Sequence, residues 1–506
     1  MLPDLRVALR SLLRNRGLAV GAMLASALGV GSATAVFSVV DRILFRPLPY
    51  PDGGRLVSVG ILAPLDSNEF IFTQNYLALR RDAPPFSAVT AFQAGASACD
   101  LTESGAVRLR CLRVDADFLA VLGLAPVLGQ SFTQEENRPG QPPVALISHA
   151  LWRSRYGSDP GLPGKTFMLD GVSTRIAGVL PANFEVPTLT EADILLPLQP
   201  NEERERPGRT LRAFARLKPG VTSDVAAVQL QPFFERLLET VPPRFRQEVK
   251  LRVRSVRDRQ TAAVRPAAIA LLGAVFAVLL IACSNIANLL LARAAARGRE
   301  MAVRAALGAS RFRLAKLALM ESLLLAAGGG VIGVALAYGL LQLAVSIAPG
   351  ALLRLAQASL DSRVLLFALG LVTVTGLLTG MTAAWQSPRL NALLGSARGV
   401  ARSGTGLRAA LVAAQIAASM VLLTGAGLLL RSLWNLENVS LGLEPDRIVT
   451  ASFTLGRERY QKAADQLAFF NELDRRLRAI PGIDSAAIAD SIPPGGGTRG
   501  RPFSSI

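Results

Sequence analysis

The sequence predicts a multi-span α-helical membrane protein with a large α+β domain inserted between its first two transmembrane helices. Two observations lead to this prediction. Five apolar stretches reach the roughly 20 residues that a helix needs to cross a bilayer, and a long mixed polar stretch, 41–265, separates the first two, which is enough for a folded domain. The apolar stretches are Leu18–Val40, Ala267–Ala292, Leu317–Ile347, Val364–Gln386 and Ala409–Arg431.

The distribution of basic residues orients these spans. The chain carries a net charge of +18, and most of this excess lies beside the spans rather than within 41–265. Basic residues concentrate on the cytoplasmic side of membrane proteins, so residues 1–16, 293–316 and 388–408 are predicted to be cytoplasmic and 41–265 to be outside. The same pattern argues against nucleic acid as a partner, because a nucleic-acid surface would place its charge on a folded face.

The N-terminal segment is predicted to form two helices. Residues 1–16 form a helix on the inner membrane surface, because leucines occupy one helical face and arginines another. Residues 17–40 form the first span. Basic residues before an apolar run with Ala-x-Ala spacings also occur in signal peptides, but this run exceeds the apolar core of about 7–15 residues typical of cleaved signals. We therefore predict an uncleaved helix.

The outer domain, 41–265, shows the patterns of an α+β fold. A strand running into a helix is predicted over Val144–Gly157, and a hairpin with an Asp-Gly turn over Thr166–Pro181. An amphipathic helix is predicted over Ser223–Thr240, and a last strand, Leu251–Arg259, precedes the second span.

Two cysteines of the outer domain lie at matched distances from a predicted turn. Alternating strands are predicted over Ala91–Leu101 and Val107–Asp115, and Cys99 and Cys111 each lie six residues from Gly105, so a symmetric hairpin places them directly opposite. Opposite Cβ atoms lie about 4.5–5.5 Å apart, slightly wider than the roughly 3.5–4.5 Å of a disulfide. An oxidising outer compartment, such as the bacterial periplasm, permits a disulfide between them; the alternative is a pair of free cysteines.

Residues 266–387 are predicted to form a membrane module that contains the second, third and fourth spans and the cytoplasmic loop 293–316. Within the loop, Arg297–Arg313 has the pattern of a short helix with one charged and one apolar face. This helix either docks on a cytoplasmic partner or only connects two spans. The candidate docking residues are Glu300, Arg304, Arg311 and Gly308, the last of which ends the helix.

Polar and small residues within the spans are predicted to face other helices. Asparagine side chains are costly next to lipid, and glycines spaced by three residues allow close helix contact. Helix packing is favoured here over a transport pathway. The residues concerned are Asn285, Asn288 and the pairs Gly329/Gly333 and Gly376/Gly380.

The C-terminal part is predicted to contain a cytoplasmic linker, 388–408, a fifth span, 409–431, and the start of a second outer domain, 432–506. The run PDGGRLVSV after the first span is echoed by PDRIVTASF after the fifth. Chance similarity is the alternative, but we favour duplication because both copies follow a span of the same orientation. A duplicated chain would end within its second outer domain, as a natural truncation or a fragment of a longer protein.

No catalytic, cofactor-binding or metal-binding set is recognised, and the chain is not expected to be an enzyme. The segment Asp159–Thr166 approaches the phosphate-binding pattern GxxxxGK[ST], but Asp159 stands where the first Gly is required. The single histidine, His149, does not allow a His-rich metal set, and no GxSxG nucleophile motif accompanies it.

Several segments together resemble one known family. FSVVDRILFRPLPYPD and LGLAPVLGQSFTQEENRPGQPPVALISHALWRSRYG are similar to the MacB-type periplasmic core domain. LLGAVFAVLLIACSNIANLLLARAAARGREMAVRAALGASRFRL is similar to the FtsX-type permease module. A second copy starting at LRAALVAAQIAASMVLLTGAGLLLRSL makes the order resemble the duplicated "orphan" ABC transporter permeases of acidobacteria, in which eight spans are expected. The chain is thus expected to be incomplete at its C-terminus.

The resemblance implies the permease subunit of an ABC-type mechanotransmission transporter in the bacterial inner membrane, with a cytoplasmic N-terminus and a periplasmic outer domain. A separate cytoplasmic ABC ATPase would bind the ATP, so no cofactor is expected in this chain. The helix with Glu300 and Arg304 would dock on that ATPase, and a periplasmic or outer-membrane partner is compatible with the family. The alternative is an FtsX-like regulator or scaffold that moves no solute and activates a periplasmic partner. The resemblance leaves the substrate, the identity of the ATPase and the oligomeric state open.

Overall fold

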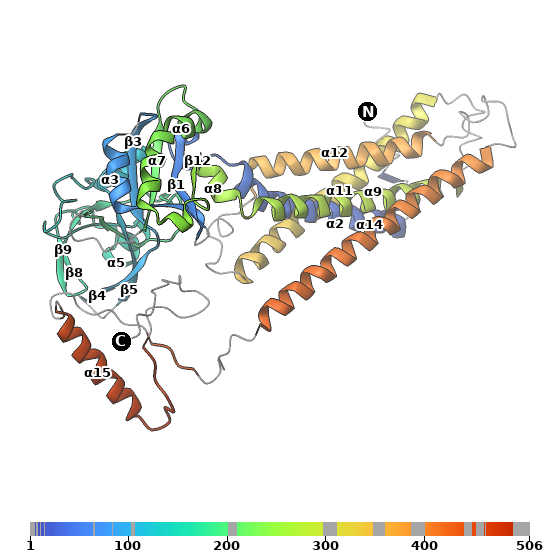
Figure 1. Ribbon diagram of the computed structural model, residues 1–506. Coiled ribbons are helices and arrows are strands. Elements are labelled where there is room, and N and C mark those ends of the chain that lie inside the picture. Colours follow the sequence, from blue (N-terminus) through green and yellow to red (C-terminus); the bar gives the residue numbers. More distant parts are fainter. Residues whose placement is uncertain are drawn as a thin grey trace. The chain divides into compact units, whose positions relative to one another are not determined.

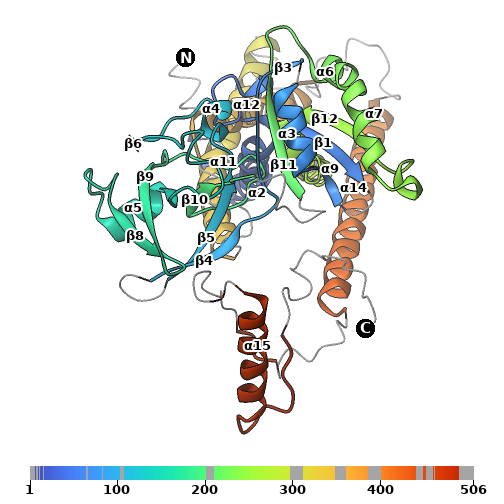
Figure 2. The same ribbon diagram turned by 60° about the vertical axis from the view of Figure 1, so that its left-hand side comes forward.

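In the computed structural model the chain forms two compact units, 1–46 with 261–439 and 47–260 with 440–506. The first unit consists of long apolar helices, and the second contains a mixed sheet that we call the outer domain (Figures 1 and 2). The structure describes residues 6, 9–10, 12–14, 16–63, 66–82, 84–102, 107–200, 210–296, 311–347, 360–385, 400–439, 448–451, 460 and 462–488.

Five described helices are long and apolar enough to cross a membrane. Each contains one of the stretches predicted as spans, to within one residue at its ends. The first helix continues directly into a π-helical turn, η1 (Asp41–Phe45). The five helices are α2 (Arg16–Val40), α9 (Arg265–Ala296), α11 (Arg311–Ile347), α12 (Ser362–Trp385) and α14 (Val400–Glu437).

Small residues bring α2, α11 and α12 into close contact, and Figure 1 shows these helices running alongside one another. A Cβ on Gly329 of α11 would lie 2.5 Å from the Cβ of Ser26 on α2, and one on Gly333 would lie 3.0 Å from a backbone oxygen of α2. A Cβ on Gly376 or Gly380 of α12 would lie 2.7 Å from a leucine side chain of α11. Both predicted glycine pairs therefore serve close helix packing, as expected.

The C-terminal part contributes two described helices. α14 contacts α9, where Gln415 Nε2 donates a hydrogen bond of 2.7 Å to Asn285 Oδ1, so Asn285 faces another helix as predicted. After α14, helix α15 (Ala463–Arg478) lies within 432–506, the segment predicted to start a second outer domain. The duplication itself stays a prediction.

The outer domain is a twelve-stranded mixed sheet with helices packed on it. Its strands run in the order β10-β7-β9-β8-β4-β5-β3-β11-β2-β1-β12, with β6 beside β9. The strands are β1 (Leu56–Ala63), β2 (Asp66–Phe72), β3 (Phe86–Gln93), β4 (Ser97–Leu101), β5 (Val107–Val114), β6 (Leu128–Gly129), β7 (Val144–Ile147), β8 (Thr166–Leu169), β9 (Val172–Val179), β10 (Ile194–Pro197), β11 (Thr210–Leu217) and β12 (Lys250–Ser255). The helices are η2 (Gly53–Arg55), α3 (Thr73–Arg81), α4 (Phe118–Leu122), α5 (His149–Tyr156), α6 (Ser223–Gln229), α7 (Gln231–Thr240), η3 (Pro243–Phe245) and α8 (Val256–Thr261).

β11 separates two cores of the outer domain. Successive side chains of a strand point to opposite faces, and Ala213 and Ala215 join one core with α3, α6 and α7. Phe214 points to the other face, where it stacks on Phe92 at 5.4 Å between ring centroids. β11 is thus buried on both faces, which explains its continuously apolar character apart from two arginines.

Two predicted elements of the outer domain are correct only in part. The helix predicted over Ser223–Thr240 is two helices that meet at Leu230, because Pro232 lacks an N–H and favours the first turn of a new helix. The strand predicted over Leu251–Arg259 ends at Ser255, whose Oγ accepts a hydrogen bond of 3.0 Å from the Asp258 N–H and caps α8. The Asp-Gly hairpin between β8 and β9 is confirmed.

Cys99 and Cys111 are joined by a disulfide between β4 and β5, with their Cα atoms 5.9 Å apart. The expected register was wrong: Cys99 lies opposite Leu109, and Cys111 lies opposite Ser97. The expected first strand is also two strands, β3 and β4. A shift of two residues keeps both sulfur atoms on one face of the sheet, so the cysteines bond diagonally rather than directly across.

Candidate functional site

Two short segments link the helices to the sheet of the outer domain. The first connector, 47–55, follows η1, and the second connector, 256–260, forms most of α8 and precedes α9. A displacement passed along the chain between α2 or α9 and the sheet must travel through one of these segments. The side chains that fix the connectors to the sheet are therefore the first candidates for functional residues.

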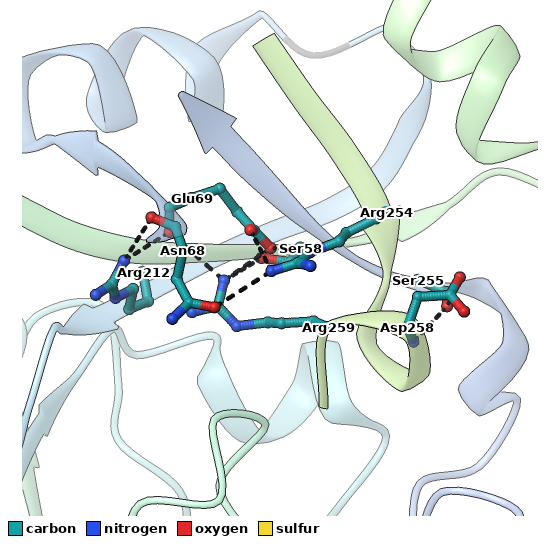
Figure 3. A network of polar contacts seen from close by, with 8 residues as sticks. All are labelled: Ser58, Asn68, Glu69, Arg212, Arg254, Ser255, Asp258 and Arg259. Atoms are coloured by element: carbon teal, nitrogen blue, oxygen red, sulfur yellow. Dashed lines mark hydrogen bonds and ion pairs between the residues drawn. The ribbon is translucent and has the colours of Figure 1, made fainter. Parts of the chain in front are cut away.

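The second connector is fixed by a network around one buried carboxylate, which we call the Glu69 network (Figure 3). Arg254 of β12 donates two hydrogen bonds to Glu69, of 3.0 Å from Nε and 2.7 Å from Nη2. Arg259 of α8 has Nη1 2.8 Å from Glu69 Oε1 and donates a 2.8 Å hydrogen bond to Ser58 Oγ. The members of the network are Ser58, Asn68, Glu69, Arg212, Arg254 and Arg259.

Strand order brings these residues together from distant parts of the chain. β1 lies between β2 and β12, and its register places Ser58 opposite Arg254. The cap at Ser255 then turns the chain from strand to helix, which carries Arg259 to the Glu69 carboxylate on β2 (Figure 3). The network therefore ties α8 to both strands at this end of the sheet.

The electrostatics of the Glu69 network favour an ionised carboxylate. Glu69 is 1% exposed, and this burial raises its pKa because a low dielectric disfavours charge. The hydrogen bonds from Arg254 and the charge of Arg259 outweigh burial and lower the pKa of Glu69 to about 2. Arg212 donates instead to the backbone oxygens of Asn68 and Glu69, at 3.2 and 2.8 Å. Such a buried arrangement becomes costly when one partner is removed.

The first connector is fixed by hydrogen bonds from arginines to backbone oxygens. Arg216 of β11 donates to Pro51 O at 3.1 Å and to Val121 O at 2.9 Å. Arg55 donates two hydrogen bonds, of 2.9 and 2.6 Å, to Leu217 O. Burial, and then the charge of Arg55, lower the pKa of Arg216. These contacts hold the connector against β11 and α4.

One face of β11 supports both connectors. Arg212, Phe214 and Arg216 alternate along the strand and therefore share a face. Arg212 belongs to the Glu69 network, Phe214 lies 5.5 Å from the Arg259 guanidinium in a cation–π contact, and Arg216 holds the first connector. Both chain links to the helices thus contact the same strand.

The candidate residues predicted from the sequence lie elsewhere. Glu300, Arg304 and Gly308 lie outside the described residues, and Arg311 is the first residue of α11. Sequence reasoning missed the Glu69 network. A signal was available, because Arg254 and Arg259 belong to an arginine-rich run and Glu69 directly precedes the apolar run Phe70–Phe72, but nothing in the sequence pairs them.

Residues weighed for chemistry in the sequence occupy ordinary structural positions. Lys165 forms an exposed ion pair with Asp159, 2.6 Å from Nζ to Oδ2. His149 begins α5, and its ring lies 5.3 Å from that of Trp152. Within the described part of the chain, no group of three or more His, Cys, Asp or Glu residues is placed to hold a metal ion.

Comparison with known families matches two regions of the chain. Residues 19–233 match the family model of the MacB-like periplasmic core domain. Residues 272–392 match that of the FtsX-like permease C-terminal region. The first match covers α2, the first connector and most of the outer domain, and the second covers α9, α11 and α12.

Three solved structures are similar to part of this chain at low identity. A domain assigned to a permease of Porphyromonas gingivalis has 19% identity and a TM-score of 0.29, covering 41% of this chain and 92% of that chain. The periplasmic region of MacB from Actinobacillus actinomycetemcomitans has 11% identity and a TM-score of 0.30, covering 42% and 93%. The extracellular domain of the Gram-positive transporter YknZ has 11% identity and a TM-score of 0.30, covering 39% and 99%. None of the curated proteins compared with the chain matches it.

Proposed function

We propose that this chain, which belongs to the MacB/FtsX-type permeases, relays conformational change between a separate cytoplasmic ATPase and its own outer domain. Membership of this family makes it a membrane subunit related to ABC transporters, with an ATPase subunit as partner. The proposal adds the mechanism: ATP is bound and hydrolysed by that partner, and the helices of this chain transmit the resulting movement.

The attachment of both connectors to the sheet supports this proposal. A buried polar network with all its members paired makes the structure around it rigid. Arg216 fixes the first connector to β11, and the Glu69 network fixes the second to β1 and β2 beside a cation–π contact with Phe214 of β11. The sheet therefore has little freedom to absorb a displacement of either connector. A movement of α2 or α9 is then passed to the outer domain as a whole.

The proposed orientation places the N-terminus, 293–316 and 388–408 in the cytoplasm and the outer domain in the periplasm of a bacterial inner membrane. This orientation is predicted from the basic residues beside the spans, which concentrate on the cytoplasmic side. Reporter fusions at Arg402 should give a cytoplasmic signal, and fusions at Asn201 and Ser440 a periplasmic one. A cytoplasmic signal at Asn201 would overturn the topology.

Contact with the ATPase is proposed for the segment Arg297–Arg313. The variant Glu300→Lys with Arg304→Glu should abolish stimulation of the partner ATPase, because it inverts the charges that set the docking register. Membrane insertion should be unchanged, since neither residue lies in an apolar span. Arg398→Glu, a charge change in the predicted cytoplasmic linker 388–408, is the control. Full stimulation by the double variant would mean that the segment is only a connector.

A further inference from the structure

The outer end of α2 carries a charged cluster that is separate from the fixation of the connectors. Asp41, the first residue of η1, is 4% exposed. Arg46, which follows η1, has Nε 3.2 Å from Asp41 Oδ2, and its Nη2 pairs with Asp361, which precedes α12. Arg363 lies at the edge, with Nη1 3.9 Å from Asp41 Oδ1. We call Asp41, Arg46, Asp361 and Arg363 the outer cluster.

The π turn is what allows Asp41 and Arg46 to pair. In an α-helix, residues three or four apart share a face, and residues five apart do not. In η1 the Arg46 N–H donates a 2.9 Å hydrogen bond to the Asp41 carbonyl, which is the i→i+5 bond of a π-helix. Arg46 therefore lies one turn from Asp41 on the same side, where its guanidinium contacts both Asp41 and Asp361.

The other half of the outer cluster is built into the start of α12. Asp361 accepts a 3.1 Å hydrogen bond from the Val364 N–H through Oδ1, so it caps α12 while it pairs with Arg46. Further along the same two helices, the rings of Phe37 and Phe367 are stacked at 3.8 Å between centroids. The ion pair and the ring stack together fix the outer end of α2 to α12.

From this geometry we propose that the outer cluster is a latch that holds η1 in its π turn and so sets the orientation of the first connector. When the Arg46–Asp361 pair opens, η1 loses the contact that stabilises the extra residue in the turn and relaxes towards an α-helix. Each residue of an α-helix adds about 100° of rotation, so this change turns the first connector about the axis of α2. The inference rests on the proposed function, to which it adds the device that converts a movement of α2 relative to α12 into rotation.

Hydrogen exchange of the full chain in lipid nanodiscs, without any ATPase, tests the latch. Asp361→Asn removes the charge and keeps a side chain that caps helices equally well. Arg46→Gln removes the charge and leaves the cap of α12 untouched. In both variants the amides of 42–46 should exchange roughly tenfold faster, because a charge-assisted hydrogen bond that restrains local opening is lost. Glu437→Gln, at the end of α14, is the control and should leave these amides unchanged.

The two variants also separate latch opening from simple misfolding. In Asp361→Asn the Val364 amide should stay protected. If α12 instead loses protection throughout, the exchange of 42–46 in Arg46→Gln decides whether the latch exists. The variant with both substitutions should exchange no faster at 42–46 than Arg46→Gln alone, since both act on one ion pair. Unchanged exchange at 42–46 in Arg46→Gln overturns the latch. Because no ATPase is present, failure of the proposed coupling cannot produce or hide this result.

Discussion

Glu69 is a single carboxylate that compensates the buried guanidinium of Arg259 and the partly buried guanidinium of Arg254, next to the second connector. In Glu69→Gln, Arg254 and Arg259 lose their counter-charge while Arg259 stays buried, and breaking such a buried pair costs about 3–5 kcal/mol. We expect this loss in the free energy of unfolding of the outer domain, measured by denaturant-dependent hydrogen exchange of β1 and β12 in the full chain. The control is Glu248→Gln, an exposed carboxylate. Equal effects of the two variants would show that the network contributes nothing to stability.

The same residue makes the stability of the outer domain depend on pH. The pKa of Glu69 falls from its usual value of 4.5 to about 2 in the folded protein. A lowered folded pKa means that the carboxylate stabilises the fold fully above pH 4.5 and loses this effect as the pH falls towards 2. The stability difference between the wild type and Glu69→Gln should therefore shrink between these two values. A difference that stays constant from neutral pH down to pH 2 would contradict the assignment.

At the residue level, the sequence could predict side-chain character but not this pairing. The arginines at 254 and 259 are visible in a basic run, yet their partner lies on β2, which reaches them only because β1 lies between β2 and β12. That strand order is a property of the tertiary structure. The candidate residues Glu300, Arg304 and Gly308 lie outside the described part of the chain, so their role stays a prediction.

Among the elements, the contact between α2 and α11 depends on the absence of a side chain at Gly329. In Gly329→Ala the new Cβ would meet the Cβ of Ser26 at 2.5 Å, so the helices must separate. Overpacking of this kind costs about 1–3 kcal/mol. Gly339→Ala on the same helix is the matched control, because nothing lies within 4 Å of its new Cβ. Thermal unfolding in nanodiscs should show a lower midpoint for Gly329→Ala alone; equal midpoints would mean that this close contact is not required.

The hairpin of β4 and β5 offers a chemical test of the outer domain. We predict that mass spectrometry of unreduced protein shows one linked species containing Cys99 and Cys111. The disulfide is expected because two close thiols in the oxidising periplasm form and keep such a bond. Separate alkylated peptides, with no linked species, would rule the disulfide out. Samples reduced before alkylation provide the reference for both free peptides.

Elements differ in how well the sequence predicted them, for physical reasons. Each predicted span lies in a long apolar helix because a long apolar run has few alternatives to a membrane helix, although the helices extend past the predicted ends by up to nine residues. The β4–β5 register was wrong by two residues because period-2 alternation specifies the face of a residue and not its partner. The break between two helices at Leu230 was missed, although Pro232 indicates the start of a new helix.

At the scale of the whole molecule, two family matches in succession give the chain its architecture: a MacB-like core domain first and an FtsX-like permease region second. The structure adds how these parts are linked through the chain: the first connector is held on β11, and the second on β1 and β2 with a cation–π contact to Phe214 of β11. A domain attached in this way is suited to being moved as one body. Such an attachment would let the helices pass a movement from the ATPase to the whole outer domain.

Hydrogen exchange of the reconstituted complex tests this relay most directly. The full chain in complex with its partner ABC ATPase would be compared in nanodiscs without nucleotide and with ATP and vanadate. We predict that exchange changes at both connectors, 47–55 and 256–260, and that Glu300→Lys with Arg304→Glu keeps both at their nucleotide-free level. Unchanged exchange at both connectors, while the chain stimulates ATP hydrolysis, would contradict the relay.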